Sequence, residues 1–245
     1  MSFPENSPTN LHIGSLQVLL LDYGYATTFD KLDWESRANS LGLTIFVNSL
    51  PVGSDWGQSL EQAITNIPCP WVLLVPKGTS PDLLDWIKKN RELVEALDGV
   101  TFRRTGGKAP WIMRLLSWCF LQPFRFLLEI PLAKNNAWLG FSNWKWEQIG
   151  YWLLGVHNKD PLNPIRLLRT AWFQKIPMQS KTAWGNLEML AKAHFLGMRL
   201  AEEICPVEVN ASQLDPREWA DLKGVLNKPI FTKDISSRNN VQSKA

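Results

Sequence analysis

Apolar runs and helical spacing alternate along the first hundred residues of the chain. Residues 16–22 (LQVLLLD) form a continuous apolar run that ends in an acid, which is typical of a strand buried on both faces of a parallel sheet. Similar runs follow at residues 43–47 (LTIFV) and 71–75 (WVLLV). The apolar spacing around residues 32–38 and 60–64 predicts a helix in each connection. This alternation favours an α/β fold with a doubly wound, mostly parallel sheet and flanking helices.

The pattern is less regular in the rest of the chain. Ser80 and Pro81 predict the start of a helix whose apolar face extends to residue 97. Gly197 predicts the end of a later helix, because glycine adopts the left-handed conformation of a C-cap. We expect further strands at residues 100–102 and 207–209, and further helices at 111–130, 144–155 and 186–196.

The length of 245 residues and the 45% hydrophobic content are sufficient for one large core. We expect a polar N-terminal tail over residues 1–14 and a single domain over residues 15–212. A C-terminal extension over residues 213–245 is expected to be partly disordered, because it is polar from about residue 227 onward.

Charge and cysteine content exclude several classes of function. The net charge of +3 is too small to indicate a nucleic-acid partner. The three cysteines lie far apart and form no CxxC pair, so neither a zinc site nor a redox couple is predicted. A reducing compartment follows, and the first residues have no apolar signal segment, so we expect a cytoplasmic protein.

Tryptophan is concentrated in the middle of the chain, where six of the 13 tryptophans lie between residues 111 and 152. Residues 111–132 are about long enough to cross a bilayer, but they include Arg114, Arg125 and Glu129 and are therefore not expected to do so. Two interpretations of this region stay open. The rings fill a core between helices, or they lie on a membrane surface.

In an open α/β sheet, ligands bind beyond the carboxyl ends of the strands. Asp22 and the residues at 48–53 and 76–78 directly follow the three apolar runs, so they are the first candidates for a binding site. The Asp22 carboxylate could accept hydrogen bonds from a ribose or a base. Alternatively, it caps the loop that follows.

The order of these segments resembles the family 2 glycosyltransferases, in particular the dolichol-phosphate mannose synthase branch. LLLDYGYATTFDKL resembles the first strand and its acidic nucleotide-binding turn, where Asp22 and Gly24 match. WVLLVPKGTSPDLLDWI resembles the strand that precedes the acidic metal motif. There, Lys77 stands among the residues that replace the acids, and Gly78 and Pro81 match the family pattern.

The resemblance extends over roughly residues 15–210. VTFRR resembles the strand that delivers an arginine to the nucleotide, and Arg103 is at the matching place. DPLNPIRLLR keeps the family spacing between an acid and two arginines, at Asp160, Arg166 and Arg169. In the region from 176 to 207, the matching residues are Glu188, Lys192, Ala193, Gly197, Glu203 and Pro206. The resemblance implies a GT-A-like, Rossmann-like domain and a nucleotide sugar as the donor.

The resemblance also implies a set of site residues. The departing diphosphate must be neutralised, and without the acidic motif there are no oxygen ligands for magnesium or manganese, so no metal site is expected. Lys77, with Arg103 and Arg166, could supply the positive charge instead, unless Lys77 lies on a solvent-facing loop. Asp160 is the candidate base for the acceptor hydroxyl, or it orients Arg166 by an ion pair.

Three functions remain as alternatives. The first is a glycosyltransferase that acts on an unknown acceptor such as a lipid phosphate or polysaccharide, at the inner membrane face if the acceptor is a lipid. The second is a catalytically inactive binding or scaffold protein with the same fold. The third is a peripheral membrane protein whose Trp-rich face binds lipid. The sequence leaves open whether the protein is an enzyme.

Overall fold

The structure is a computed structural model, and it describes residues 15–22, 30–51, 56–65, 67–104, 151, 155–182, 185–207, 221, 224–225 and 227–231. Gly24 and the expected helix at 111–130 lie outside the described residues, as does nearly all of the Trp-rich region. Within the described part of the chain, no helix has the length and apolar character to span a membrane.

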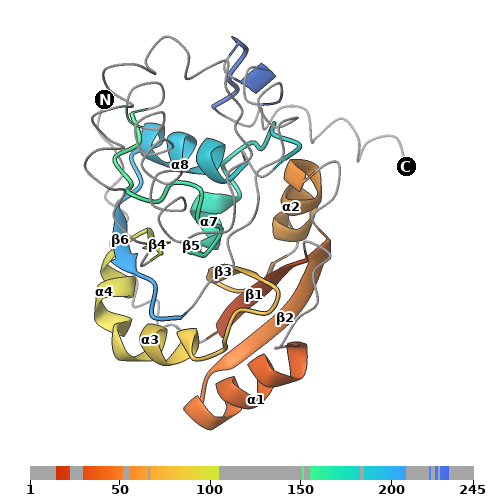
Figure 1. The fold of residues 1–245 in the computed structure, drawn as a ribbon, viewed down its shortest axis with the longest axis vertical. Coiled ribbons are helices and arrows are strands. Elements are labelled where there is room, and N and C mark those ends of the chain that lie inside the picture. Colours follow the sequence, from red (N-terminus) through yellow and green to blue (C-terminus); the bar gives the residue numbers. More distant parts are fainter. Residues whose placement is uncertain are drawn as a thin grey trace, which may run out of the picture.

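Six strands among the described residues form one mixed sheet in the order β2-β1-β3-β5-β4-β6 (Figure 1). The strands are β1 (Ser15–Asp22), β2 (Thr44–Pro51), β3 (Trp71–Pro76), β4 (Gly99–Arg103), β5 (Arg166–Arg169) and β6 (Leu200–Ile204). β1 pairs in parallel with β2 and β3, and β4 pairs in parallel with β6. β5 is antiparallel to both of its neighbours. The sheet is therefore mostly parallel, as the sequence predicts.

The last described strand precedes the strand expected at residues 207–209, of which residues 208–209 lie outside the described part of the chain. β6 occupies residues Leu200–Ile204 at the edge of the sheet, while Val207 lies in a bend after it. None of the five residues of β6 is fully buried. An edge strand with acids on its surface has no continuous apolar run, which is why the apolar pattern does not reveal it.

Side chains of β1 alternate between two cores, one on each face of the sheet. Leu16, Val18 and Leu20 belong to one cluster, which includes Trp34 and Ile87 from the helices below. Leu19 and Leu21 belong to the other. On that second face the cluster includes Leu60, Ile64, Phe173 and Met189. The strand is apolar at nearly every position because both of its faces are buried.

Helices cover both faces and make three layers (Figure 1). The first face packs against α1 (Lys31–Leu41), α3 (Leu83–Lys89) and α4 (Arg91–Ala96). The second packs against α2 (Trp56–Thr65), α7 (Thr170–Phe173) and α8 (Gly185–Phe195). The helix expected from Pro81 to residue 97 is divided at Asn90 into α3 and α4.

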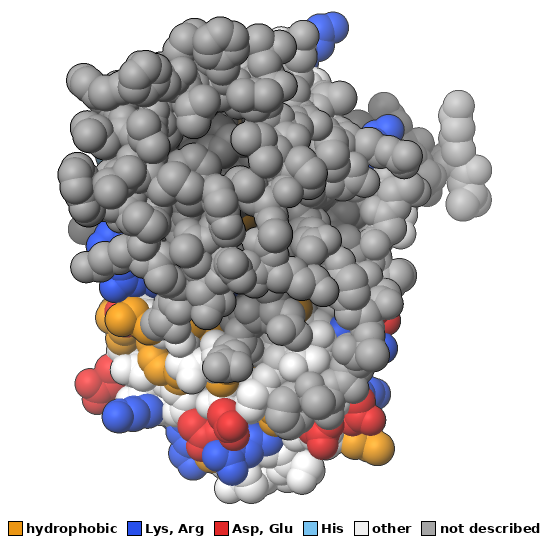
Figure 2. All heavy atoms as spheres, viewed as in Figure 1, with side chains coloured by type: hydrophobic (Ala, Val, Ile, Leu, Met, Phe, Trp, Pro, Cys, Tyr) orange, Lys and Arg blue, Asp and Glu red, His pale blue; other side chains and the backbone are white. Residues whose placement is uncertain are grey.

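Local signals explain where two of these helices begin and end. Asp30 and Asp33 form a reciprocal capping box at the start of α1, and Gly42 ends the helix at φ 68°. Gly197, at φ 74°, follows α8 as predicted. Figure 2 shows basic and acidic side chains mixed at the lower end of the molecule. Arg37 of α1 forms an ion pair with Asp85 of α3 at 2.7 Å.

The C-terminal segment packs against the loop before α8. The Gln179 side chain donates to the Lys228 carbonyl at 2.9 Å and accepts from the Ile230 amide at 2.7 Å. The Phe231 and Phe195 rings lie 4.1 Å apart. Residues 228–231 of the C-terminal segment therefore contact the rest of the fold.

The same loop also contacts the first turn of α2. The Gly57 amide donates to the Ser180 carbonyl at 3.0 Å, and a Cβ atom at Gly57 would lie 2.3 Å from that oxygen. We therefore expect Gly57→Ala to lower the free energy of unfolding by about 1–3 kcal/mol, as overpacking does elsewhere. Denaturant unfolding would measure this change.

Gly224→Ala is the matched control for this substitution. Gly224 is also helical, and a Cβ atom there would meet no atom within 4 Å. Because alanine has the better helix propensity, we expect Gly224→Ala to be neutral or slightly stabilising. Equal destabilisation by both substitutions would contradict the close approach of α2 to the loop.

Candidate functional site

The sheet changes its winding direction at β1, and this creates the first candidate site. The chain passes from β1 to β2 on one side and then crosses to β3 on the other, so the carboxyl ends of β1 and β3 flank a topological switch point. Asp22 is the last residue of β1, and Lys77 directly follows β3. The Lys77 ammonium lies 3.1 Å from the Asp22 carboxylate, and about a third of each side chain is exposed.

The backbone of the turn after β3 holds Lys77 beside β1. The Lys77 amide donates to the Leu21 carbonyl at 2.8 Å, which extends the ladder between the two strands by one bond. Gly78 follows at φ 90°, a conformation that side chains with a Cβ rarely adopt. Thr79 then turns into the protein and is buried. The glycine therefore allows the chain to leave the strand sharply just after the lysine.

The other candidate residues lie at the same end of the strands as Asp22 and Lys77. Because β5 is antiparallel to β3 and β4, the carboxyl end of β4 and the amino end of β5 face the same way as the carboxyl ends of β1 and β3. Arg103 ends β4, and Arg166 begins β5. β4 is two strands from β3, which corresponds to a separation of roughly 10 Å between their backbones.

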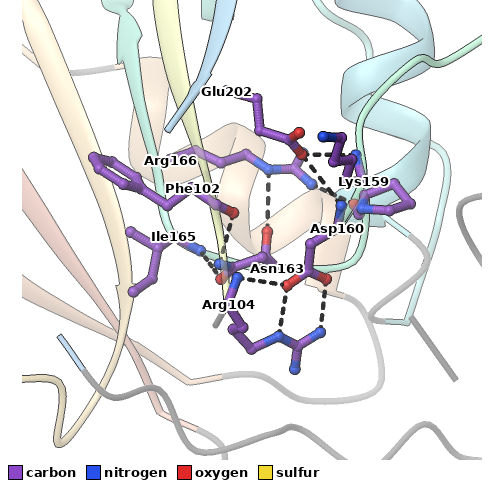
Figure 3. A network of polar contacts seen from close by, with 9 residues as sticks. Phe102, Arg104, Lys159, Asp160, Asn163, Ile165, Arg166 and Glu202 are labelled. Atoms are coloured by element: carbon purple, nitrogen blue, oxygen red, sulfur yellow. Dashed lines mark hydrogen bonds and ion pairs between the residues drawn. The ribbon is translucent and has the colours of Figure 1, made fainter. Parts of the chain in front are cut away.

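Asp160 lies in a buried polar network before β5 (Figure 3). Its two carboxylate oxygens accept from the Arg104 guanidinium at 2.7 and 2.8 Å, and one of them also accepts from the Arg104 amide at 3.0 Å. The side chains of this pair are only 3% and 9% exposed. The Glu202 carboxylate of β6 accepts from the Lys159 and Asp160 amides. The loop is thus tied to both β4 and β6.

Asn163 and Arg166 brace the same loop from inside. The Asn163 side chain donates to the Phe102 carbonyl at 2.7 Å and accepts from the Ile165 amide at 3.0 Å. The Arg166 side chain is buried, and its guanidinium donates to the backbone carbonyls of Asn163, Pro161 and Asn186. These bonds join the loop, the start of β5 and the start of α8.

The structure therefore separates the predicted residues into two groups. Asp22, Lys77 and Gly78 lie together at the β1 and β3 ends and are partly exposed. Asp160 and Arg166 are buried beneath the loop before β5. Arg103 is partly buried, and its carbonyl accepts from the Cys205 amide at 2.8 Å.

Sequence reasoning missed Arg104, Asn163 and Glu202. Arg104 is next to the predicted Arg103, but nothing in the sequence indicates which of the two arginines meets Asp160. Glu202 lies in β6, a strand that the apolar pattern does not predict. The sequence analysis gives Arg166 as the possible ion-pair partner of Asp160, whereas the structure pairs the Asp160 carboxylate with Arg104.

A second buried network stands between α8 and the loop at 177–182. The Lys192 ammonium donates to the carboxylate of Glu188 and to the side chain of Gln179. The Glu188 carboxylate also accepts from the Gln179 and Ser180 amides at 2.9 and 2.8 Å. The pair is almost fully buried, and burial lowers the pKa of Lys192 although the Glu188 charge opposes the shift.

The described residues contain no group of three or more His, Cys, Asp or Glu side chains that could hold a metal ion. At the turn after β3, the side chains of Val75 and Pro76 have no donor atoms and Lys77 has only a cationic one, so this turn does not fit a divalent cation. The two described cysteines, Cys69 and Cys205, are buried, and burial raises the pKa of each thiol.

No family model matches the chain, and no curated protein matches it by sequence. Solved structures do match. The mannosyl-3-phosphoglycerate synthase of Rubrobacter xylanophilus aligns with 91% of this chain and 77% of its own, at 11% identity and a TM-score of 0.51. A glucosyl-3-phosphoglycerate synthase of Mycobacterium tuberculosis, in complex with Mn2+, UDP-glucose and phosphoglyceric acid, aligns with 88% of this chain and 81% of its own, at 14% identity and a TM-score of 0.45.

The match to the Rubrobacter xylanophilus enzyme shows the fold, although the two sequences are only 11% identical. Most of both chains is included, and the match is consistent with the mixed α/β sheet and its flanking helices described above. The chain therefore has the GT-A type of fold seen in nucleotide-sugar-dependent glycosyltransferases.

Proposed function

We propose that the protein binds a nucleoside diphosphate sugar at the carboxyl ends of β1 and β3 and transfers the sugar to an acceptor. The observation that supports this most directly is the Asp22–Lys77 pair at the switch point of a GT-A sheet. This is where open α/β sheets bind their ligands. The pair combines a positive charge for phosphate with an acceptor for the hydroxyl or ring N–H donors of a nucleoside.

Lys77 takes the place of a metal ion in this proposal. The departing diphosphate gains negative charge, and a fixed ammonium at the strand end stabilises that charge without a cation. The turn at Gly78 lets the backbone approach the phosphates closely. The solved glucosyl-3-phosphoglycerate synthase complex contains Mn2+ and UDP-glucose. This chain would bind such a donor without the metal at this turn.

The role of Asp160 as the base for the acceptor hydroxyl has a structural competitor. Both of its oxygens already accept from Arg104 and its side chain is only 3% exposed, so an acceptor hydroxyl has little access to it. We propose that Asp160 positions Arg104 and the loop before β5. Arg166, buried among three carbonyls, has the corresponding role beside α8, while Arg103 remains a candidate for contact with the diphosphate.

The same observation supports a second candidate function. If the Asp160 carboxylate stays bound to Arg104, the protein would bind a nucleotide sugar without transferring it, as a binding or scaffold protein with this fold. The dolichol-phosphate mannose synthase branch, a lipid acceptor and a cytoplasmic membrane surface remain proposals from the sequence. So does the division into a domain over residues 15–212 and an extension over residues 213–245.

Calorimetric titration with UDP-glucose and GDP-mannose, with and without Mn2+, tests the proposal. We expect binding of at least one donor that Mn2+ does not strengthen and that Lys77→Ala weakens by about tenfold or more, as for the loss of a charged phosphate contact. Product formation from the bound donor would distinguish transfer from binding alone. Binding that requires Mn2+ and tolerates Lys77→Ala would contradict the proposal.

A further inference from the structure

We infer that the Asp22–Lys77 pair is the closed state of the site and that a ligand opens it by exchange. In this exchange an anionic phosphate takes Lys77 from Asp22, and a hydrogen-bond donor on the same ligand binds the Asp22 carboxylate. The inference rests on the function proposed above, because it takes a nucleoside diphosphate as the ligand. It adds a reason why the protein would bind such a ligand in preference to a diphosphate alone or a nucleoside alone.

The exchange requires a pair that is easily broken, and the geometry meets this requirement. About a third of each side chain is exposed, and the two charges are 3.1 Å apart. Such partly exposed pairs contribute little to stability because water screens them. The buried Asp160–Arg104 pair differs, since its side chains are 3% and 9% exposed. Of these two pairs at this end of the strands, Asp22–Lys77 is the one that a ligand can reach.

Lys77 can also move without disturbing the sheet. Its backbone amide is fixed by the Leu21 carbonyl, whereas its ammonium is at the end of a flexible four-carbon chain. The backbone on either side is anchored by β3 and by the buried Thr79. A phosphate can therefore draw the ammonium away from Asp22 while the turn keeps its shape.

Charge balance decides which ligand completes the exchange. A diphosphate has more charge and more acceptor oxygens than one carboxylate, so it competes well for the ammonium. Taken alone, however, it leaves the Asp22 carboxylate without its cation and close to another anion. A nucleoside alone supplies hydrogen-bond donors to Asp22, but it provides no anion to replace the carboxylate beside the Lys77 ammonium. A ligand that contains both parts satisfies both side chains.

Four forms of the protein and three probes test the exchange. The forms are the wild type, Asp22→Asn, Lys77→Met and Asp85→Asn, and the probes are inorganic pyrophosphate, uridine and UDP, titrated at low ionic strength. Asp85 is the matched control, because it is a partly exposed acid that pairs with Arg37 between α1 and α3. Thermal unfolding of each variant establishes that it is folded.

We expect Asp22→Asn to bind pyrophosphate roughly fivefold more tightly than the wild type, because the ion pair no longer competes for Lys77. Lys77→Met should lose pyrophosphate binding and bind uridine more tightly, since the Asp22 carboxylate then no longer pairs with an ammonium. Asp85→Asn should behave as the wild type. Weaker pyrophosphate binding by Asp22→Asn would mean that Asp22 holds Lys77 in position for phosphate, and it would overturn the exchange, as would the absence of pyrophosphate binding in every form.

The two proposals fail in different ways. If the wild type does not bind UDP but Asp22→Asn gains pyrophosphate binding through Lys77, the competition between Asp22 and phosphate for Lys77 stands, whereas a nucleoside diphosphate as the ligand, and with it the proposed function, falls. If UDP binds equally to the wild type and to Lys77→Met, a nucleotide site exists away from Lys77 and the exchange falls.

Discussion

Replacement of Lys192 with methionine is expected to lower the free energy of unfolding by about 3–5 kcal/mol, the usual result of leaving a buried charge without its partner. The Lys192 and Glu188 side chains are 2% and 1% exposed. Methionine keeps most of the volume but leaves the Glu188 carboxylate buried, with the Gln179 and Ser180 amides as its remaining donors among the described residues. Denaturant unfolding monitored by tryptophan fluorescence would measure the loss.

Two further variants make this result specific. Lys31→Met breaks a pair with the same four-residue spacing, Lys31–Glu35, but on the exposed surface of α1. It should cost about 0.5 kcal/mol or less. Glu188→Gln combined with Lys192→Met should recover part of the stability, because the buried negative charge is also removed. A Lys192→Met protein as stable as Lys31→Met would contradict the buried network.

Asp160→Asn is expected to destabilise the protein by a similar amount, about 3–5 kcal/mol. The asparagine side chain cannot accept both guanidinium bonds that the carboxylate accepts, and it removes the negative charge that faces Arg104 in a buried site. The loop before β5 should loosen as a result. Thermal and denaturant unfolding of the variant would detect the change, and Arg104→Met should have an effect of similar size.

The double variant separates a structural role from a catalytic one. If the ion pair is the main role of Asp160, the two single substitutions are not additive, and a double-mutant cycle gives a coupling energy of about 1–3 kcal/mol. If Asp160 is instead a base whose charge is not needed for folding, Asp160→Asn would remain nearly as stable as the wild type and would lose only sugar transfer. That outcome would contradict the positioning role proposed here.

The first three strands could be predicted from the sequence because each is nearly all apolar over five or more residues. Burial on both faces leaves this pattern in a central strand such as β1 or β3. β6 (LAEEI) lacks the pattern because two of its five residues are acids, and all five are at least partly exposed. The division of one expected helix at Asn90 likewise has no strong local signal in the sequence.

The part of the candidate site that is formed by residues at strand ends could be predicted from the sequence. Asp22 and Lys77 follow two apolar runs, and strands that are parallel neighbours bring such residues together. The partner of Asp160 could not be predicted, since Arg104 lies 56 positions earlier in the chain and only the pairing of β4 with β5 brings it near. The contact of residues 228–230 with Gln179 also depends on the completed fold.

Photoaffinity labelling tests the central claim, that ligands bind at the carboxyl ends of β1 and β3, most directly. A UDP-glucose analogue with an azido group on the uracil ring would be cross-linked to the full chain, and the labelled peptides mapped by mass spectrometry. We expect unmodified UDP-glucose to prevent labelling of the peptides around Asp22 and Lys77. Labelling confined to a distant surface such as α1, or labelling that UDP-glucose does not prevent, would contradict the claim.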